Sequence, residues 1–324
     1  MGLREVLTPM TSWKEIQNEI DATKSQEKPG GDFDSVRRGK YKLLSDLTKR
    51  PLIVYATAFH NPIKAQVAAP FLSIDLSDKD GFKEVTQKLK SDKVDVFIHS
   101  PGGSAEATES IVSILRNKFK DVRFIITGAA KSAATMLAMS GDVILMDDAA
   151  EVGPIDPQVR VGGRYSPAGS IIEQFDRATE VLKKNPDQLP VWVPILREFA
   201  PALLVECENY INLSQTLVSS WLAKYMFAGD KKAKQKAKKI AGHLSNEKNF
   251  LSHARRIDAV ELEKVGVKIQ KLSDQKADVQ DAVKQLHLVV MATLDATGAV
   301  KIFENSEGDV LIRLVNVQVV PNNR

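Results

Sequence analysis

The sequence predicts an α/β fold built on a mainly parallel sheet. Short apolar, β-branched runs alternate with segments of helical periodicity between residues 51 and 146. Two glycine-containing turns, at 100–104 and 128–134, each follow a predicted strand and open a predicted helix. Strands and helices alternating at this spacing are typical of βαβ units, whose crossovers are right-handed.

The predicted elements follow one another along the chain. The first fifty residues hold charged helical segments, broken at 28–31, which we interpret as a peripheral N-terminal helical arm. Strands are expected at 51–56, 94–99, 122–127 and 143–146, and helices at 80–89, 105–118 and 132–139. Because ligands bind at the carboxyl ends of the strands in such sheets, both glycine turns lie where a functional site is expected.

The pattern becomes helical beyond Pro167. Long periodic segments at 171–184 and 201–227 flank a stretch with several prolines, 185–194, that we predict to be a loop. Residues 231–239 contain six lysines in nine positions, which we interpret as a solvated helix face rather than a nucleic-acid or acidic-partner patch. Alternating apolar and polar residues from 286 to 320 predict a small antiparallel β element.

Composition excludes several classes of protein. The 324 residues include 45 Lys and Arg against 41 Asp and Glu, a net charge of +4, which does not mark a nucleic-acid binder. A single cysteine, Cys207, excludes an internal disulfide framework and fits a reducing compartment, with the thiol buried in a helix. No signal peptide or membrane-spanning run is visible, so we expect a cytoplasmic protein without membrane association.

Motifs for metals and nucleotides are missing from the sequence. It contains no His-Glu-x-x-His pattern and no pair of cysteines. It also contains no glycine loop ending in Lys-Ser or Lys-Thr of the kind that binds ATP. We therefore expect no cofactor, and energy-dependent unfolding of a substrate would require a separate unfoldase partner.

The two glycine turns carry the residues best suited to chemistry. In Ser100-Pro-Gly-Gly-Ser104, adjacent glycines allow positive φ, and amides at the start of a helix can stabilise a developing negative charge. In the second turn, Ser132 stands among small residues after a strand, as a nucleophile does at a strand-to-helix elbow. The alternative is that Ser132 only caps the helix.

Together these turns resemble the ClpP and SppA peptidases. Gly153-Pro-Ile-Asp-Pro-Gln158 more narrowly resembles the hallmark of the serine dehydrogenase proteinase family, and further similarity lies at 36–38, 44–55, 190–192, 217–222 and 268–269. The resemblance implies a ClpP/crotonase-like fold of stacked ββα units and assembly into a homo-oligomer. It divides the chain into an N-terminal arm at 1–50, a peptidase domain at 51–270, and a C-terminal helical and β extension at 271–324.

The resemblance also implies roles for individual residues. Ser132 is the expected nucleophile, and the amides of Gly103 and Ala133, with that of Gly102, are the expected oxyanion hole. Removing one such donor typically lowers the rate by about 10²–10³-fold. The reaction implied is hydrolysis of peptide bonds in peptides or proteins through an acyl-enzyme.

The general base does not transfer from ClpP, because its His-Gln-Pro sequence is replaced here by Asp156-Pro-Gln. His253 is the favoured candidate, since it precedes a segment that resembles the part of ClpP relatives carrying the third triad member. His99, next to the first turn, is the alternative. Lys131 could form a Ser-Lys dyad of the SppA kind, although a solvent-facing role is favoured. Asp156 could orient a base or cap its turn.

Three functions fit these residues. The first is a serine peptidase, a hydrolase acting on peptide or protein substrates. The second is a catalytically silent ClpP-like scaffold or binding protein that lacks a general base. The third is a crotonase-type acyl-thioester enzyme, which would share the oxyanion hole without using Ser132.

Overall fold

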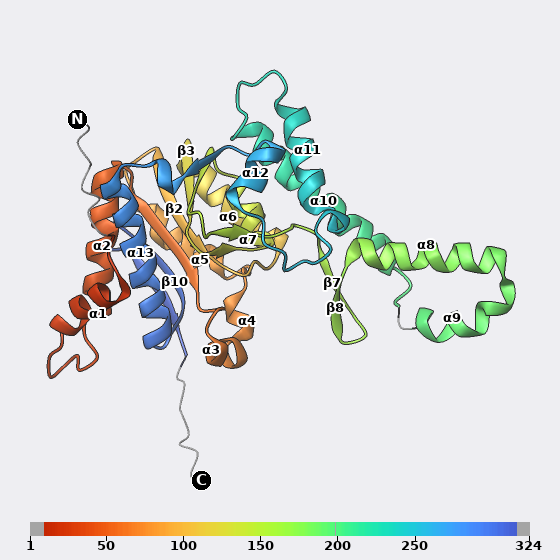
Figure 1. Ribbon diagram of the computed structural model, residues 1–324, viewed down its shortest axis with the longest axis horizontal. Helices are drawn as coiled ribbons and strands as arrows, with labels where there is room; N and C mark the ends of the chain where they lie inside the picture. Colours follow the sequence, from red (N-terminus) through yellow and green to blue (C-terminus); the bar gives the residue numbers. More distant parts are fainter. Residues whose placement is uncertain (1–9, 198, 316–324) are drawn as a thin grey trace, which may run out of the picture.

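A seven-stranded sheet forms the centre of the molecule in the computed structural model, which describes residues 10–197 and 199–315 (Figure 1). Its strand order is β11-β10-β1-β2-β3-β5-β9. Five neighbouring strands are parallel: β1 (Leu52–Thr57), β2 (Lys93–His99), β3 (Asp121–Ile126), β5 (Val143–Met146) and β9 (Ile269–Lys271). The mainly parallel α/β fold predicted from the sequence is therefore confirmed.

Helices cover both faces of this sheet, and successive side chains along each strand point to opposite faces. In β1, Ile53 and Tyr55 belong to one buried cluster, whereas Leu52, Val54 and Ala56 belong to the other. The first cluster is completed by α5 (Asp78–Gln87), α6 (Ala105–Lys118), α7 (Ala133–Ala138), α10 (Leu203–Lys224), α11 (Ala233–Ser245) and α12 (Ala259–Val265). The second is completed by α1 (Trp13–Ala22), α2 (Phe33–Thr48) and α13 (Ala277–Ala296).

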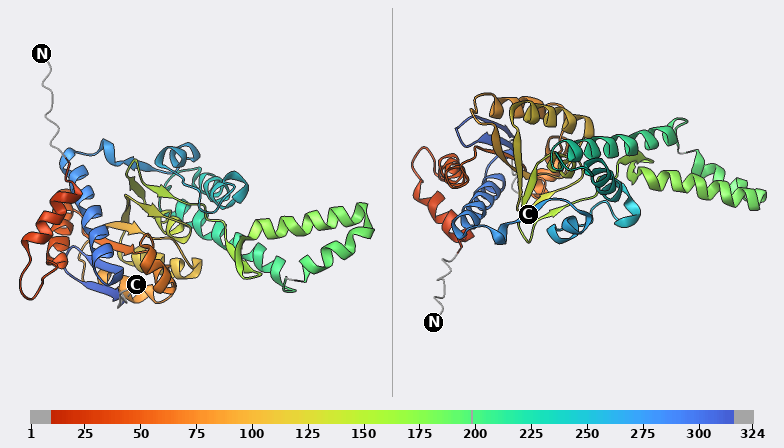
Figure 2. Two further views of the ribbon diagram at one scale, coloured as in Figure 1. Left: turned by 60° about the horizontal axis from the view of Figure 1, so that its bottom comes forward. Right: turned by 90° about the horizontal axis from the view of Figure 1, so that it is seen from above.

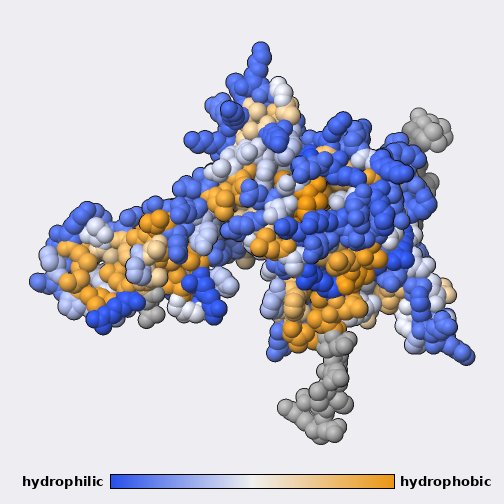
Figure 3. Space-filling view, turned by 180° about the vertical axis from the view of Figure 1, so that it is seen from behind, coloured by the Kyte–Doolittle hydropathy of each residue, from blue (hydrophilic) through white to orange (hydrophobic). Residues whose placement is uncertain are grey.

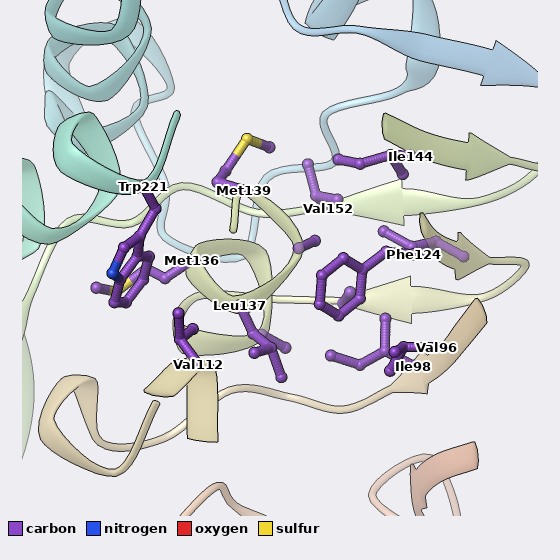
Figure 4. Packing of buried hydrophobic residues seen from close by; sticks show 14 of the residues in the cluster. Val96, Ile98, Val112, Phe124, Met136, Leu137, Met139, Ile144, Val152 and Trp221 are labelled. Carbon is purple, nitrogen blue, oxygen red and sulfur yellow. The ribbon is translucent and has the colours of Figure 1, made fainter. Parts of the chain in front are cut away.

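The helix that follows Ser132 lies inside the first cluster. All six residues of α7 are buried. Figure 4 shows Met136 and Leu137 among Val112, Phe124 and Trp221, which come from a helix, a strand and a second helix. The segment that carries Ser132 is thus fixed by apolar packing on several sides, which limits its movement.

The N-terminal helices are part of the main body rather than a peripheral arm. Ile16 and Ile20 of α1 and Tyr41 and Leu44 of α2 are fully buried in the second cluster. Arg37 of α2 forms a fully buried ion pair with Glu304 of β10 (2.5 Å). These contacts attach both helices to the sheet and correct the expectation of a peripheral arm.

The C-terminal part also differs from the expectation. Residues 286–296, expected to be extended, form the second half of α13, and most of them are buried on all sides. The expected antiparallel element consists of β10 (Ala299–Asn305) and β11 (Val310–Leu314), which extend the central sheet by antiparallel pairing of β10 with β1. The part of that prediction that falls on 316–320 lies outside the described residues.

An arm projects from the body and reaches well beyond it in the views of Figure 2. It contains the hairpin β7 (Gln158–Val161) and β8 (Arg164–Pro167), α8 (Ala168–Lys184), a 3-10 turn (Pro186–Gln188), α9 (Leu189–Leu196) and the first part of α10. The loop predicted at 185–194 is therefore wrong, because α9 starts at Leu189. Pro190 occupies the first turn of α9, where the missing amide proton is tolerated.

Short elements complete the fold. They are α3 (Pro62–Val67), α4 (Ala69–Leu72), β4 (Ala129–Ala130), β6 (Glu151–Val152) and 3-10 turns at Glu247–Asn249 and Leu272–Asp274. β4 and β6 pair in parallel beside the main sheet. Across 10–197 and 199–315, none of the helices is both long and apolar enough to span a bilayer.

Candidate active site

Backbone hydrogen bonds join the two glycine turns. The amide of Ser100 donates to the carbonyl of Ala129 (3.0 Å), and the amide of Lys131 donates to the carbonyl of Ser100 (3.0 Å). These bonds form a parallel bridge between Ser100 and Ala130, just beyond the ends of β2 and β3. The turns therefore meet at the carboxyl edge of the parallel strands, as the sequence predicts.

Ser132 adopts a strained backbone conformation at the start of α7. Its φ is +50° and its ψ is −118°, a combination that residues with a side chain rarely adopt. Such strain costs on the order of 1–3 kcal/mol and tends to occur at functional positions. Although Ser132 occupies the N-cap position, its side chain forms no capping hydrogen bond, which removes the structural alternative for this serine. The hydroxyl is thus presented at a sharp turn between a strand and a helix.

Gly102 allows the first turn to lie directly against Ser132. Its φ is +100°, and a Cβ at this position would lie 2.7 Å from the Cβ of Ser132 and 3.0 Å from the amide nitrogen of Ala133. Any side chain here would therefore collide with the serine and with the start of α7. Only glycine allows this approach.

Gly103 is held from the other side by Ile74, a residue that sequence reasoning missed. The amide of Ile74 donates to the carbonyl of Gly102 (2.7 Å), and the amide of Ser104 donates to the carbonyl of Ile74 (2.9 Å). A Cβ on Gly103, whose φ is +151°, would lie 2.2 Å from the Ile74 carbonyl oxygen. Because these bonds use the groups on either side of Gly103, its own amide is not part of this bridge.

The three amides expected to form an oxyanion hole differ in their availability. The amide of Gly102 donates to the Oγ of Ser100 (3.2 Å), so it already has an acceptor. The amide of Ala133 is the first of α7 and belongs to the four N-terminal amides that have no acceptor within a helix. Gly103 and Ala133 are therefore the better donors for a bound anion.

Asp156 and His253 form a hydrogen-bonded pair although 97 positions separate them in the sequence. The Nδ1 of His253 lies 2.8 Å from Oδ1 of Asp156, and Gln158 Nε2 donates to Oδ2 of Asp156 (2.7 Å). The two segments are brought together by reciprocal backbone bonds between Val152 and Ile257. Asp156 is 2% exposed and His253 is 29% exposed, so a buried carboxylate holds a histidine that remains accessible.

These residues line a single pocket of about 490 Å³. Its lining includes every candidate for the catalytic centre except His99 and Lys131: Gly102, Gly103, Ser132, Ala133, Asp156 and His253. Apolar side chains complete it, among them Met136, Ile155 and Leu213, with Tyr165 from the hairpin and Tyr210 from α10. The pocket thus combines a polar edge with an apolar wall.

The loop that carries His253 is fastened to the arm. Lys248 pairs with Glu173 of α8 (3.1 Å), and the carboxylate of Glu247 lies against Gly169, where a Cβ would come within 2.1 Å of Oε1. Leu251 in the same loop has φ of +63° and is 88% exposed. The position of His253 therefore depends on α8 as well as on Asp156.

The other two candidate bases lie elsewhere. His99 does not line the pocket: its ring stacks on Phe59, and its Nε2 lies 3.3 Å from His60. Burial lowers the pKa of His99 to about 3, with smaller contributions from His60 and His287. Lys131 pairs with Glu151 (2.8 Å) and does not line the pocket either. Within the described parts of the chain, His, Cys, Asp and Glu side chains form no group suited to a metal ion.

The fold belongs to the ClpP-like α/β class. Within that class, the chain belongs to the family of ClpP-like SDH-type serine proteinases, whose sequence profile matches residues 67–292. The family resemblance inferred from the glycine turns and from 153–158 is thereby confirmed, and the family is one of serine peptidases.

Similar proteins share only part of the chain. The uncharacterized protein MJ0137 of Methanocaldococcus jannaschii is 24% identical over 212 residues, covering 64% of this chain and 66% of the relative. MJ1495 of the same organism is 33% identical over 147 residues, covering 45% of this chain and 44% of the relative. The chain thus spans less than two thirds of either relative.

Two solved structures are similar to part of this chain. Both are mutants of the 1510-N membrane-bound stomatin-specific protease, and one of them is in complex with a substrate peptide. They cover 61% of this chain and 70% and 74% of their own chains, with sequence identities of 16% and 14%. The TM-score is 0.38 in both cases.

Proposed function

We propose that this protein is a serine endopeptidase that cleaves peptide bonds in peptides or proteins through an acyl-enzyme on Ser132. His253 is the general base, and Asp156 orients it. The amides of Gly103 and Ala133 stabilise the oxyanion. The observation that carries the proposal is the hydrogen-bonded Asp156–His253 pair in the pocket that Ser132 also lines.

The steps follow from the atoms available. Because Nδ1 of His253 is engaged by Asp156, Nε2 is the nitrogen that accepts the proton of Ser132 Oγ as this oxygen bonds to the substrate carbonyl carbon. The same proton then passes to the leaving amine as the carbon–nitrogen bond breaks. Water, deprotonated by Nε2, hydrolyses the ester, and the proton returns to Ser132.

The order of these residues along the chain is Ser132, Asp156, His253. The carboxylate stands where ClpP has its histidine, and the histidine lies in the late segment that carries the third member in ClpP relatives. The same side-chain chemistry recurs in several chain orders on unrelated folds, so the exchange does not argue against a triad. The scaffold hypothesis was motivated by the missing ClpP-type histidine, and the pairing of His253 with Asp156 supports the peptidase over it.

Labelling with a fluorophosphonate tests the proposal, because the reagent reacts only with an activated serine. The wild-type chain should be labelled stoichiometrically on Ser132 and should cleave casein. Ser132→Ala should lose both activities, while Ser104→Ala, at the serine that ends the first glycine turn, should keep the labelling. Circular dichroism would check that both variants fold. Undiminished cleavage by Ser132→Ala would refute the proposal, as would a wild-type chain that is never labelled.

We also propose that the protein is cytoplasmic and that copies of it assemble into a homo-oligomer. α9 consists of eight apolar residues, and none of them is buried. Figure 3 shows hydrophobic surface gathered on the arm. A helix that is apolar on all sides is normally covered, and a second copy of the chain would cover it. Light scattering coupled to size-exclusion chromatography measures the assembly, and a strictly monomeric protein would contradict this part.

A further inference from the structure

A second site lies outside the active-site pocket, in a groove of about 980 Å³ between α10 and α11. Helix α10 lines it with hydroxyl side chains such as Thr216 and Ser219. The opposite wall, formed by the turn between the helices and the start of α11, is basic. Five lysines line the groove: Lys224, Lys231, Lys232, Lys234 and Lys238.

The positive charge of this groove is not compensated. None of its five lysines forms an ion pair with a carboxylate within 10–197 and 199–315, although many lysines elsewhere on the surface do. The one carboxylate in the lining, Asp230, is occupied by Lys236 (2.5 Å) and by the amide of Lys232 (2.7 Å). Since the whole chain is nearly balanced at +4, this excess is local.

The start of α11 adds to the same charge. Its N-cap is Lys232, with no side-chain capping bond, and no acidic residue lies in its first turn. The N-terminus of a helix carries a partial positive charge, so lysines at this end are unfavourable by the same mechanism that makes acidic residues favourable. An anion bound in the groove would relieve this repulsion.

We infer that the groove is a docking site for an acidic segment of another polypeptide. Lysine is a compact point charge that suits carboxylates in many orientations. A single-stranded nucleic acid would be expected to use aromatic platforms and arginine, and none of the described residues lining the groove is aromatic or an arginine. The hydroxyls of α10 provide further hydrogen bonds to a peptide.

This groove and the active-site pocket have no lining residue in common. Tyr210 and Leu213 of α10 line the pocket, whereas Thr216, Ser219 and Ala223 line the groove. At 100° per residue the two sets are centred about 120° apart around the helix axis, and the groove set lies further along α10. A segment bound in the groove would leave the pocket open, so the site would hold a substrate or adaptor protein nearby and raise its effective concentration.

Fluorescence anisotropy with labelled dodecapeptides tests this inference. The probe is a peptide rich in Glu, the control replaces each Glu with Gln, and the host protein is Ser132→Ala, so that the peptides are not cleaved. We expect the Glu peptide to bind at least about ten times more tightly than the Gln peptide at low salt. Its affinity should fall as the salt concentration rises.

Matched triple variants show whether binding occurs in the groove. Lys232→Gln/Lys234→Gln/Lys238→Gln should weaken binding about tenfold. Lys14→Gln/Lys90→Gln/Lys93→Gln, which removes the same charge outside the groove, should change it less than about twofold. Equal losses in both triples, or equal binding of the Glu and Gln peptides, would overturn the inference. So would tighter binding of a single-stranded RNA of equal length. None of these outcomes depends on whether Ser132 is a nucleophile.

Discussion

His99 and His253 belong to two contrasting regions of the molecule. His99 ends a central strand and is buried beside Phe59, His60 and Gly128, with its pKa lowered to about 3. His253 lies on a surface loop, is partly exposed, and has a buried carboxylate on Nδ1. The first environment keeps an imidazole neutral, whereas in the second a buried carboxylate fixes the orientation of the ring and leaves Nε2 free of that contact. In the proposed mechanism, a hydrogen-bonded partner and access to solvent therefore identify the base better than proximity to a motif in the sequence does.

The largest effect is expected when each histidine is replaced in turn. His253→Ala should lower kcat by up to about 10⁶-fold, the effect of losing the base of a serine protease, because Ser132 is not deprotonated at neutral pH without it. His99→Gln should stay within about tenfold of the wild-type chain. Steady-state hydrolysis of a fluorogenic peptide measures both. A larger loss in His99→Gln than in His253→Ala would reverse the assignment.

A smaller effect is expected from the partner of His253. Asp156→Asn keeps the shape of the side chain but does not hold His253 in the required tautomer, and the comparable change in a serine protease lowers kcat by about 10⁴-fold. Gln158→Leu, which removes only the contact to the other carboxylate oxygen, serves as the matched control and should lose far less. The same fluorogenic peptide measures both rates. Equal activity of Asp156→Asn and Gln158→Leu would contradict the triad.

The smallest effect concerns stability in acid. Because burial lowers the pKa of His99 from 6.5 to about 3, the unfolded chain binds a proton that the folded chain does not between these values. Stability should therefore fall as the pH drops below 6.5, by up to about 1.4 kcal/mol per pH unit from this residue. Urea unfolding of His99→Gln at pH 7.0 and 5.5 should show a smaller loss than the wild-type chain. An unchanged loss would mean that His99 does not titrate in this way.

The sequence predicts the core of the fold well because buried parallel strands read as continuous apolar runs. It fails at residues 286–296, since a helix buried on all sides has no 3.6-residue period to detect. It also fails at α9, where the prolines suggest a loop although Pro190 suits a first helical turn.

The candidate site divides in the same way. Ser132 and the glycines could be predicted because each turn is local in sequence, and the strained φ of +50° at Ser132 fits that prediction. The contact between Asp156 and His253 spans 97 positions and depends on a bridge between Val152 and Ile257, which no local pattern encodes. Ile74 was missed for a similar reason, because it acts through its backbone.

The attachment of the His253 loop to α8 means that movement of the arm would change the position of the proposed base. Lys248 and Glu173 lie near the surface, and such a pair contributes only about 0–1 kcal/mol. A free energy of this size can shift the fraction of molecules with His253 in place by up to about fivefold. Whatever binds the apolar tip at α9 could therefore alter the active population without touching the pocket, and the rate of hydrolysis would report on the state of the arm.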